Sequence, residues 1–324
     1  MNIIEVKNLS KNFKEIVAVK NISFNVQKGE IFGFLGPNGA GKSTCINMLS
    51  TILPATNGEA KINGFSIAKD RDGVRKSIGL VFQDPSLDDR LTAAENLNFH
   101  GKLYNVPKNE FSMRMKEVLE LVELWDRKDD IVRTFSGGMK RRLEIARGLL
   151  HYPAVLFLDE PTIGLDPQTR AHLWEYIMQL KREKGMTIFM TTHYMNEAEF
   201  CDRIAIIDHG EIVALNTPEA LKHSVGGDII TMRSKELQNL REEIKRRYDI
   251  EPKQIDDVLI IEVKNGETFL PKLFNDLDAS ISSIELRQPT LDDVFLSITG
   301  RKIRDEEVSA KDRNRQHMRM RNHH

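Results

Sequence analysis

Residues 36–44 read Gly-Pro-Asn-Gly-Ala-Gly-Lys-Ser-Thr, and this stretch constrains the fold more than any other part of the chain. Its glycines, lysine and serine stand at the spacing of a phosphate-binding loop, a turn that leads into a helix N-terminus. The apolar run 31–35 before it is typical of a short buried strand, and residues 44–50 after it are predicted to be helical. A chance glycine turn is the alternative, and the strand–loop–helix context disfavours it.

The residue types in this loop predict how it would hold a polyphosphate. Gly36, Gly39 and Gly41 let the backbone approach phosphate oxygens and take a positive φ where a β-carbon would clash. Lys42 can reach the β- and γ-phosphates, and the hydroxyl of Ser43 can ligate Mg²⁺. The other loop residues that we expect to line the nucleotide are Pro37, Asn38, Ala40 and Thr44.

Two adjacent carboxylates follow a second predicted buried strand, residues 154–158. Ending such a strand in Asp159 and Glu160 is costly because buried charges lose their hydration. Beside a phosphate loop the pair has a use: Asp159 can hold the Mg²⁺ shell, and Glu160 can orient or deprotonate the attacking water. His193 follows the strand predicted over residues 187–191, at the edge where ligands gather in doubly wound sheets. The alternative for a lone histidine is a satisfied polar side chain.

Short strands are predicted between residues 2 and 35. Phe13 lies in the predicted loop between the first two, where an aromatic ring can stack on a base, although core packing is the commoner role of a single Phe. The Asn-Gly pair at residues 63–64 predicts a two-residue hairpin turn. A strand over residues 78–82 delivers Gln83 to its end, where a solvated cap is the alternative to a functional role.

From about residue 84 to residue 150 the pattern changes to helices only. Thr92 and Glu95 form a capping box, and Pro107 breaks the helix that they open. A third helix begins near Ser136. Its basic residues are expected mostly on the outside: Lys140, Arg141, Arg142 and Arg147.

The bulk composition is that of an ordinary globular protein. It provides no general excess of positive charge that would attract nucleic acid. The 324 residues are 40% hydrophobic and 29% charged, with a net charge of −1. That length suits one large domain and a smaller one. The two cysteines, Cys45 and Cys201, lack a partner motif, which favours burial in a reducing compartment. We expect no signal peptide, and no apolar run is long enough to cross a bilayer, so any membrane role needs another subunit.

Gly226 and Gly227 mark a predicted domain boundary. Residues 226–300 alternate strand and helix patterns and predict a small α+β module of the ferredoxin-like type. Its last helix is predicted to be capped by Thr290 with Asp293. Residues 301–324 contain eight Lys or Arg against four Asp or Glu and lack an apolar period, which predicts a disordered basic tail.

Taken in order, six motifs resemble the ATP-binding subunits of ABC transporters over residues 1 to about 225. They are the phosphate loop, Gln83, Phe-Ser-Gly-Gly-Met at residues 135–139, Asp159-Glu160, Gly-Leu-Asp at residues 164–166 and His193. The usual Leu-Ser-Gly-Gly-Gln of the family is changed at both ends here, with Met139 in place of the final Gln.

The resemblance implies an α/β fold, the P-loop NTPase of ABC type, with an antiparallel β-subdomain and a helical subdomain. It also implies a head-to-tail homodimer that sandwiches two ATP molecules with Mg²⁺. One chain would hold each ATP through Lys42, Ser43 and Gln83. The other would hold it through the helix start at Ser136, Gly137 and Gly138.

Further roles come from the resemblance alone. Gln83 would ligate Mg²⁺ and the attacking water and signal to a membrane subunit. His193 would steady the γ-phosphate beside Glu160. Asp166 would lie in the loop that crosses between monomers, and Phe13 is similar to the base-stacking aromatic of the family.

The function that the resemblance implies is ATP binding and hydrolysis at the cytoplasmic face of a membrane, coupled to a separate permease of about six helices. Residues 287–296 look like the C-terminal motif of the drug-export and daunorubicin-resistance branch, which favours export of a drug or other hydrophobic compound. The alternative is a soluble ABC-type ATPase that acts on nucleic acid or the ribosome. The single phosphate loop and the short helical insert disfavour it. A non-hydrolysing regulatory cassette would lack Glu160 or His193, and both are present.

Overall fold

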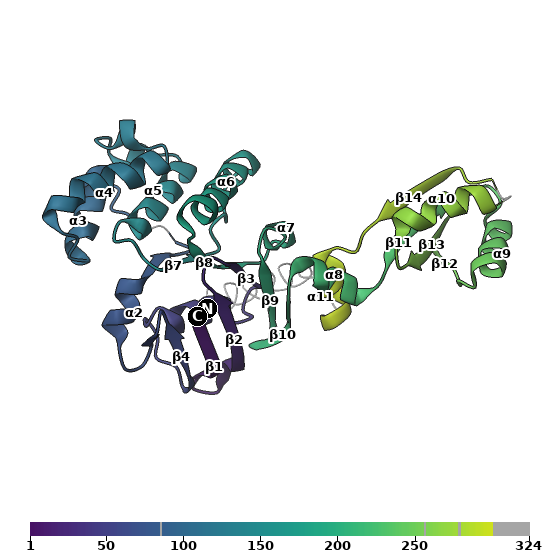
Figure 1. Ribbon diagram of the computed structural model, residues 1–324, viewed down its shortest axis with the longest axis horizontal. Helices are drawn as coiled ribbons and strands as arrows, with labels where there is room; N and C mark the ends of the chain where they lie inside the picture. The colour runs from purple at the N-terminus through teal and green to yellow at the C-terminus, as the bar shows by residue number, and fades with distance from the viewer. Residues whose placement is uncertain (85, 256, 278–279, 301–324) are drawn as a thin grey trace, which may run out of the picture. The chain divides into compact units, whose positions relative to one another are not determined.

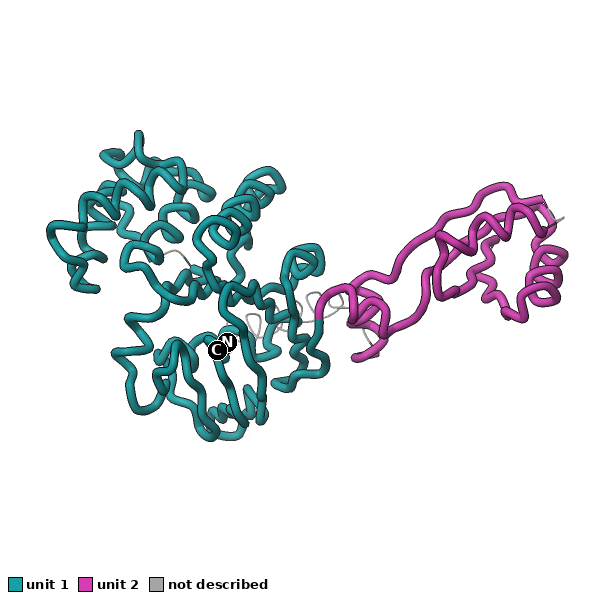
Figure 2. The backbone as a smooth tube through the Cα atoms, viewed as in Figure 1, with its two compact units in different colours: residues 1–216, 306–324 teal, residues 217–305 magenta. Residues whose placement is uncertain are grey.

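The computed structural model of the chain describes residues 1–84, 86–255, 257–277 and 280–300. It divides into two compact units (Figure 2): the first covers Met1–Asn216, and the second begins at Thr217. The predicted basic tail, residues 301–324, lies outside the described residues.

A six-stranded sheet in the first unit positions the predicted site (Figure 1). Its strands are β3 (Ile31–Leu35), β6 (Ile78–Val81), β7 (Val155–Asp159), β8 (Thr187–Thr192), β9 (Arg203–Asp208) and β10 (Glu211–Asn216). Their order is β10-β9-β3-β8-β7-β6, parallel from β9 to β6, with β10 antiparallel to β9. Every residue of β3, β7 and β8 is buried, as in central strands covered on both faces. The carboxyl ends of these parallel strands meet at one edge, where ligands bind in open α/β sheets.

A second, antiparallel sheet of the first unit has the order β2-β1-β4-β5. Its strands are β1 (Asn2–Phe13), β2 (Ile16–Gln27), β4 (Asn57–Ile62) and β5 (Phe65–Ser66). The Asn-Gly pair at residues 63–64 joins β4 to β5, which confirms the predicted hairpin. The sequence predicts only short strands before residue 35, whereas β2 is one long strand, because shifts of register between β1 and β2 absorb the interruptions of the apolar pattern.

Aromatic side chains join the two sheets of the first unit. Phe24 of β2 lies 5.4 Å, between ring centroids, from Phe32 and from Phe34, both in β3. Phe189 of β8 lies 5.6 Å from Phe32 and 5.2 Å from Phe157 of β7. These rings belong to one continuous core to which both sheets contribute, so the antiparallel sheet holds the phosphate-loop strand in place.

Three helices fill the segment predicted to be all-helical: α3 (Ala93–Leu103), α4 (Lys108–Leu121) and α5 (Gly137–Leu149). Two short 3₁₀ turns lie between α4 and α5, at Trp125–Arg127 and Val132–Thr134. The capping box of Thr92 and Glu95 opens α3, and Pro107 stands at the N-cap of α4, both as predicted.

The other helices of the first unit are α1 (Lys42–Leu49), α2 (Arg71–Ser77), α6 (Pro167–Lys184) and α7 (Met195–Ala198). The sequence did not predict α2, because it is short and charged and only Val74 and Ser77 are buried in it. No helix in the described ranges has both the length and the apolarity needed to cross a bilayer.

The second unit contains α8 (Pro218–Val225), β11 (Asp228–Arg233), α9 (Leu237–Tyr248), β12 (Lys253–Ile255), β13 (Val258–Val263), α10 (Gly266–Asp276), β14 (Ser283–Arg287) and α11 (Leu291–Thr299). Its antiparallel sheet has the order β12-β13-β11-β14, and the β-α-β-β-α-β sequence of elements is that of a ferredoxin-like module. The sequence missed β12, which has three exposed residues at the sheet edge. Whereas the sequence placed a boundary at Gly226, this unit begins at Thr217 because α8 packs against α11.

Candidate active site

The phosphate loop follows β3 directly and ends at the first turn of α1. A β-carbon on Gly36 would lie 2.2 Å from the carbonyl oxygen of Ile207. One on Gly41, whose φ is +104°, would lie 2.6 Å from the carbonyl oxygen of Ala18. The loop is therefore pressed between β9 and β2, and glycine is required at both positions.

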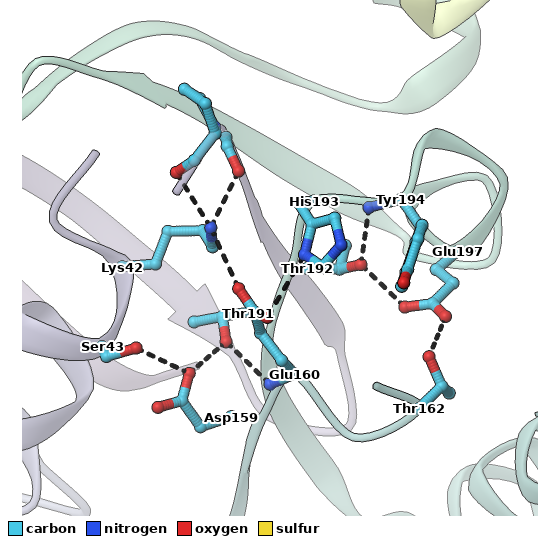
Figure 3. Close-up of polar contacts among 12 residues, drawn as sticks. Lys42, Ser43, Asp159, Glu160, Thr162, Thr191, Thr192, His193, Tyr194 and Glu197 are labelled. Atoms are coloured by element: carbon cyan, nitrogen blue, oxygen red, sulfur yellow. Dashed lines mark hydrogen bonds and ion pairs between the residues drawn. The ribbon is translucent and has the colours of Figure 1, made fainter. Parts of the chain in front are cut away.

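Lys42 is the best-held side chain of the loop (Figure 3). Its Nζ donates to the carbonyl oxygens of Gly36 and Pro37 at 2.8 and 3.0 Å, and lies 3.1 Å from Oε1 of Glu160. Its side chain is 4% exposed and that of Glu160 is 7% exposed, so this ion pair is buried. An ammonium group and a carboxylate thus meet at the mouth of the loop.

Glu160 lies between Lys42 and His193. Its Oε2 is 3.2 Å from Nδ1 of His193, which follows β8. Burial raises the pKa of Glu160, but the hydrogen bond with His193 and the charge of Lys42 lower it further, so its pKa is below the ordinary value. Glu160 is therefore ionised at neutral pH and able to accept a proton.

Asp159, the last residue of β7, faces the start of α1. Its Oδ1 accepts hydrogen bonds from the hydroxyl of Ser43, at 3.2 Å, and from the hydroxyl of Thr191 (Figure 3). Serine and carboxylate oxygens are hard donors of the kind that Mg²⁺ prefers, and Mg²⁺ commonly takes only one or two protein ligands. No cluster of three or more His, Cys, Asp or Glu suited to a metal occurs in the described part of the chain. The pair Ser43 and Asp159 fits a metal ion that completes its shell with phosphate oxygens and water.

Neither Gln83 nor Phe13 takes part in the hydrogen bonds and ion pairs described above for Lys42, Asp159 and Glu160. Gln83 is exposed and stands two residues beyond the end of β6. Phe13 is the last residue of β1, paired with Ile16, and not a loop residue as the sequence analysis had it. It is 44% exposed with the ammonium group of Lys11 5.1 Å from its ring centre, so the core-packing alternative is wrong.

The helix start at residues 136–138 lies against the loop that contains Asp166. Ser136 caps α5 by accepting from the backbone of Met139 at 3.2 Å. A β-carbon on Gly138 would lie 2.3 Å from the side chain of Thr169 in α6. The carboxylate of Asp166 caps α6 by accepting hydrogen bonds from the backbone N–H of Thr169, at 3.0 Å, and from the hydroxyl of Thr169, at 2.6 Å. These hydrogen bonds lower the pKa of Asp166. Both residues thus have a structural role as helix caps in addition to any role with nucleotide.

The structure corrects the prediction for Arg141, which is buried and not on the outer face of α5. Its guanidinium donates to the carboxylate of Glu144 at 3.0 Å, and Glu144 is fully buried. It also donates to backbone carbonyl oxygens at both strand ends beside the site, those of Phe82, Asp159, Glu160 and Pro161. Helical periodicity predicts that Arg141 is exposed like its basic neighbours. Periodicity takes no account of carbonyl groups on other elements that need a hydrogen-bond donor.

Two further residues beside the site carried no signal in the sequence. Thr191 in β8 donates to Asp159 and accepts from the backbone N–H of Glu160 at 3.0 Å. Glu197, in the single turn α7, is buried and accepts hydrogen bonds from Thr162 and Thr192. Neither residue belongs to one of the six sequence motifs. One is a threonine within an apolar strand, and the other is a glutamate in a short polar segment.

Comparison with known proteins identifies two family regions. Residues 19–163 match the profile of the family described as ABC transporter. Residues 217–299 match that of the C-terminal domain of ATP-binding proteins like DrrA1-3. The match to the second region extends the resemblance beyond the nucleotide-binding motifs.

Relatives match nearly the full length of the chain. It is 40% identical over 313 residues to the linearmycin resistance ATP-binding protein LnrL of Bacillus subtilis, covering 93% of this chain and 100% of LnrL. It is 37% identical over 308 residues to the daunorubicin/doxorubicin resistance ATP-binding protein DrrA of Streptomyces peucetius, covering 92% of each.

The fold is similar to a solved dimeric ATP-binding cassette in a post-hydrolysis state with ADP and phosphate bound, with a TM-score of 0.60 and 31% identity. The similarity covers 66% of this chain and 98% of that one. The glycine loop with Lys42, the two carboxylates and His193 lie at one edge of the sheet. The chain is also closely related to the proteins named above. It therefore belongs to the family of ATP-binding subunits of ABC transporters and is an ATPase.

Proposed function

We propose that this chain hydrolyses ATP at the sheet edge formed by β3, β7 and β8 and thereby powers export of a drug or other hydrophobic compound through a separate membrane permease. The observation that carries the proposal is the contact of Glu160 with both Lys42 and His193 within 3.2 Å. A charged phosphate-loop lysine, an ionised carboxylate and a histidine at one point are the groups that cleavage of a γ-phosphate requires.

Nucleotide binding would use the loop backbone and its two polar side chains. N–H groups of residues 36–44 would surround the phosphates, and Lys42 would neutralise charge on the β- and γ-phosphates. Ser43 and Asp159 would hold Mg²⁺, with Gln83 reaching it from the strand end, and bound Mg²⁺ would neutralise charge on the phosphate oxygens. Phe13, exposed at the tip of β1, is available to stack on the base.

Hydrolysis would depend on Glu160 as the general base. A water between its carboxylate and the γ-phosphorus would attack in line, its proton would pass to Glu160, and the bond to the ADP oxygen would break. His193 would donate a hydrogen bond to the γ-phosphate and hold Glu160 at the correct angle. The lowered pKa of Glu160 fits this role, because the residue must be ionised before the water arrives.

A second copy of the chain would complete each pocket. Ser136, Gly137 and Gly138 present the N-terminus of α5, and the first two of these residues are exposed. Such a helix start favours an anion. We infer that the N-terminus of α5 meets the γ-phosphate held by the partner copy, with Asp166 close to the interface between the two copies.

Relatives support our proposal for the membrane partner and the cargo. LnrL and DrrA are named as resistance ATP-binding proteins for linearmycin and for daunorubicin and doxorubicin. We propose that this chain likewise serves a permease, of about six transmembrane helices, and binds it at the cytoplasmic face. No observation favours the alternative of an ATPase that acts on nucleic acid or ribosomes.

Replacing Glu160 by Gln tests this function. Glu160→Gln keeps the size of the side chain but cannot accept the proton, so we expect ATP affinity within about threefold of wild type and turnover lowered at least about 100-fold. ATP with Mg²⁺ should then accumulate a dimer, measured by light scattering after gel filtration. Glu175→Gln, at an exposed position of α6, is the control and should keep the wild-type rate. Undiminished hydrolysis by Glu160→Gln would contradict the assignment of the base.

A further inference from the structure

Glu197 is a buried carboxylate that lies beside Thr162 and Thr192 (Figure 3). Its Oε2 accepts a hydrogen bond from the hydroxyl of Thr192 at 2.7 Å. Its Oε1 accepts one from the hydroxyl of Thr162. Thr162 comes two residues after Glu160, and Thr192 comes directly before His193. One side chain thus joins the loop after β7 to the last residue of β8.

The contacts around Glu197 fix the direction of each hydrogen bond. The hydroxyl of Thr192 already accepts from the backbone N–H of Tyr194 at 2.9 Å, so its own hydrogen points to Glu197. The hydroxyl of Thr162 likewise donates to the carboxylate of Glu197. A glutamine at this position would present an N–H to one of these hydroxyls, which would have to turn from donating to accepting.

A cation lies beside Glu197 on a third element. Nε of Arg170, in α6, lies 3.8 Å from Oε1 of Glu197, and its guanidinium lies over the ring of Tyr194 at 4.5 Å. The backbone N–H of Arg170 also bonds to the carbonyl oxygen of Asp166 at 3.0 Å. Through Arg170 the same carboxylate is thus connected to the loop that contains Asp166.

We propose that Glu197 is a positioning residue that holds the loop after β7 against the end of β8 and thereby sets the approach of Glu160 to His193. This inference depends on the catalytic roles proposed above for those two residues. Glu197 itself does not face the phosphate loop and takes no part in the chemistry. Its loss should let the loop after β7 move relative to the end of β8, which lowers the rate of the chemical step and leaves ATP binding intact.

The test uses the full chain and separates catalysis from stability. We expect Glu197→Gln to lower kcat at least about tenfold with a KM for ATP within about twofold of wild type. Thr162→Val removes one hydroxyl without adding charge and should show the same split. Glu197→Asp keeps the charge and should recover part of the lost rate. The control is Val74→Ala in α2, a buried substitution in the same unit that lowers the melting temperature without touching either loop.

The outcomes distinguish the proposal from its alternatives. A kcat within twofold of wild type in Glu197→Gln and Thr162→Val would overturn it. So would a loss of rate no greater than in Val74→Ala at an equal fall in melting temperature, because Glu197 would then be structural only. If Glu197→Gln does not fold, Thr162→Val alone decides. A wild-type chain that hydrolyses no ATP would instead refute the proposed function itself.

Discussion

Replacing Arg141 by Met tests how the helical part of the first unit is joined to the catalytic edge. Arg141 in α5 is 6% exposed, and its guanidinium reaches the end of β6 and the end of β7. Arg141→Met keeps the aliphatic volume but leaves Glu144, which is 0% exposed, without its cationic partner. Several buried carbonyl oxygens lose their donor as well.

The expected cost follows from this geometry. Removing one member of a buried ion pair costs about 3–5 kcal/mol, because the remaining charge is left without compensation. In a unit of this size 1 kcal/mol shifts the melting temperature by about 2–4 °C, so we expect a fall of about 10 °C. Arg141→Met with Glu144→Leu removes both charges and should recover part of that loss, although the carbonyl oxygens stay unpaired.

Differential scanning calorimetry of the single and double variants measures these shifts. Arg142→Met is the matched control. Its guanidinium is 25% exposed and pairs with a carboxylate that is 78% exposed, so we expect a cost below about 1 kcal/mol. A melting temperature of Arg141→Met within about 2 °C of wild type would refute this reasoning. A double variant no more stable than Arg141→Met would show that the unpaired charge is not the main cost.

Three further predictions concern the loop, the base and the thiols. Gly36→Ala should abolish ATP binding, measured by fluorescence of a nucleotide analogue, whereas Gly39→Ala, with open space around it, should cost only about 1 kcal/mol in backbone strain. Because the pKa of Glu160 is lowered on folding, its stabilising effect is present above about pH 4.5 and lost as pH falls through the lower folded value. Denaturant titrations should therefore show the gap in unfolding free energy between wild type and Glu160→Gln narrowing in acid, and a constant gap would contradict this. Burial raises the pKa of Cys45 and Cys201, so a thiol reagent should label neither in the folded chain and both in denaturant. Rapid labelling of either cysteine under native conditions would contradict this prediction.

Sequence reasoning succeeded where one short segment determines its own structure. The Asn-Gly turn at residues 63–64, the capping boxes at Thr92 and Thr290, and the loop at residues 36–44 depend on neighbours within a few positions. The carboxylates that end β7 were found for a similar reason, because the cost of burying them is visible from the apolar run alone.

Sequence reasoning failed where contacts with distant elements determine the burial or the partners of a residue. Arg141 is buried because carbonyl oxygens at the ends of two strands need donors, and nothing within α5 shows this need. Glu197 accepts hydrogen bonds from Thr162 and Thr192, which lie 35 and 5 residues from it along the chain. The edge strand β12 has no buried residue and therefore no pattern to recognise.

The central claim is that each ATP pocket contains residues of two copies, and mixing two inactive variants tests it most directly. Lys42→Ala disables the phosphate loop, and Ser136→Arg blocks the helix start, so neither should hydrolyse ATP alone. A mixed dimer has one pocket with both lesions and one with neither. We predict that hydrolysis with Mg²⁺ reappears when the two are combined in equal amounts, and a mixture that stays at the level of its parents would contradict a shared pocket.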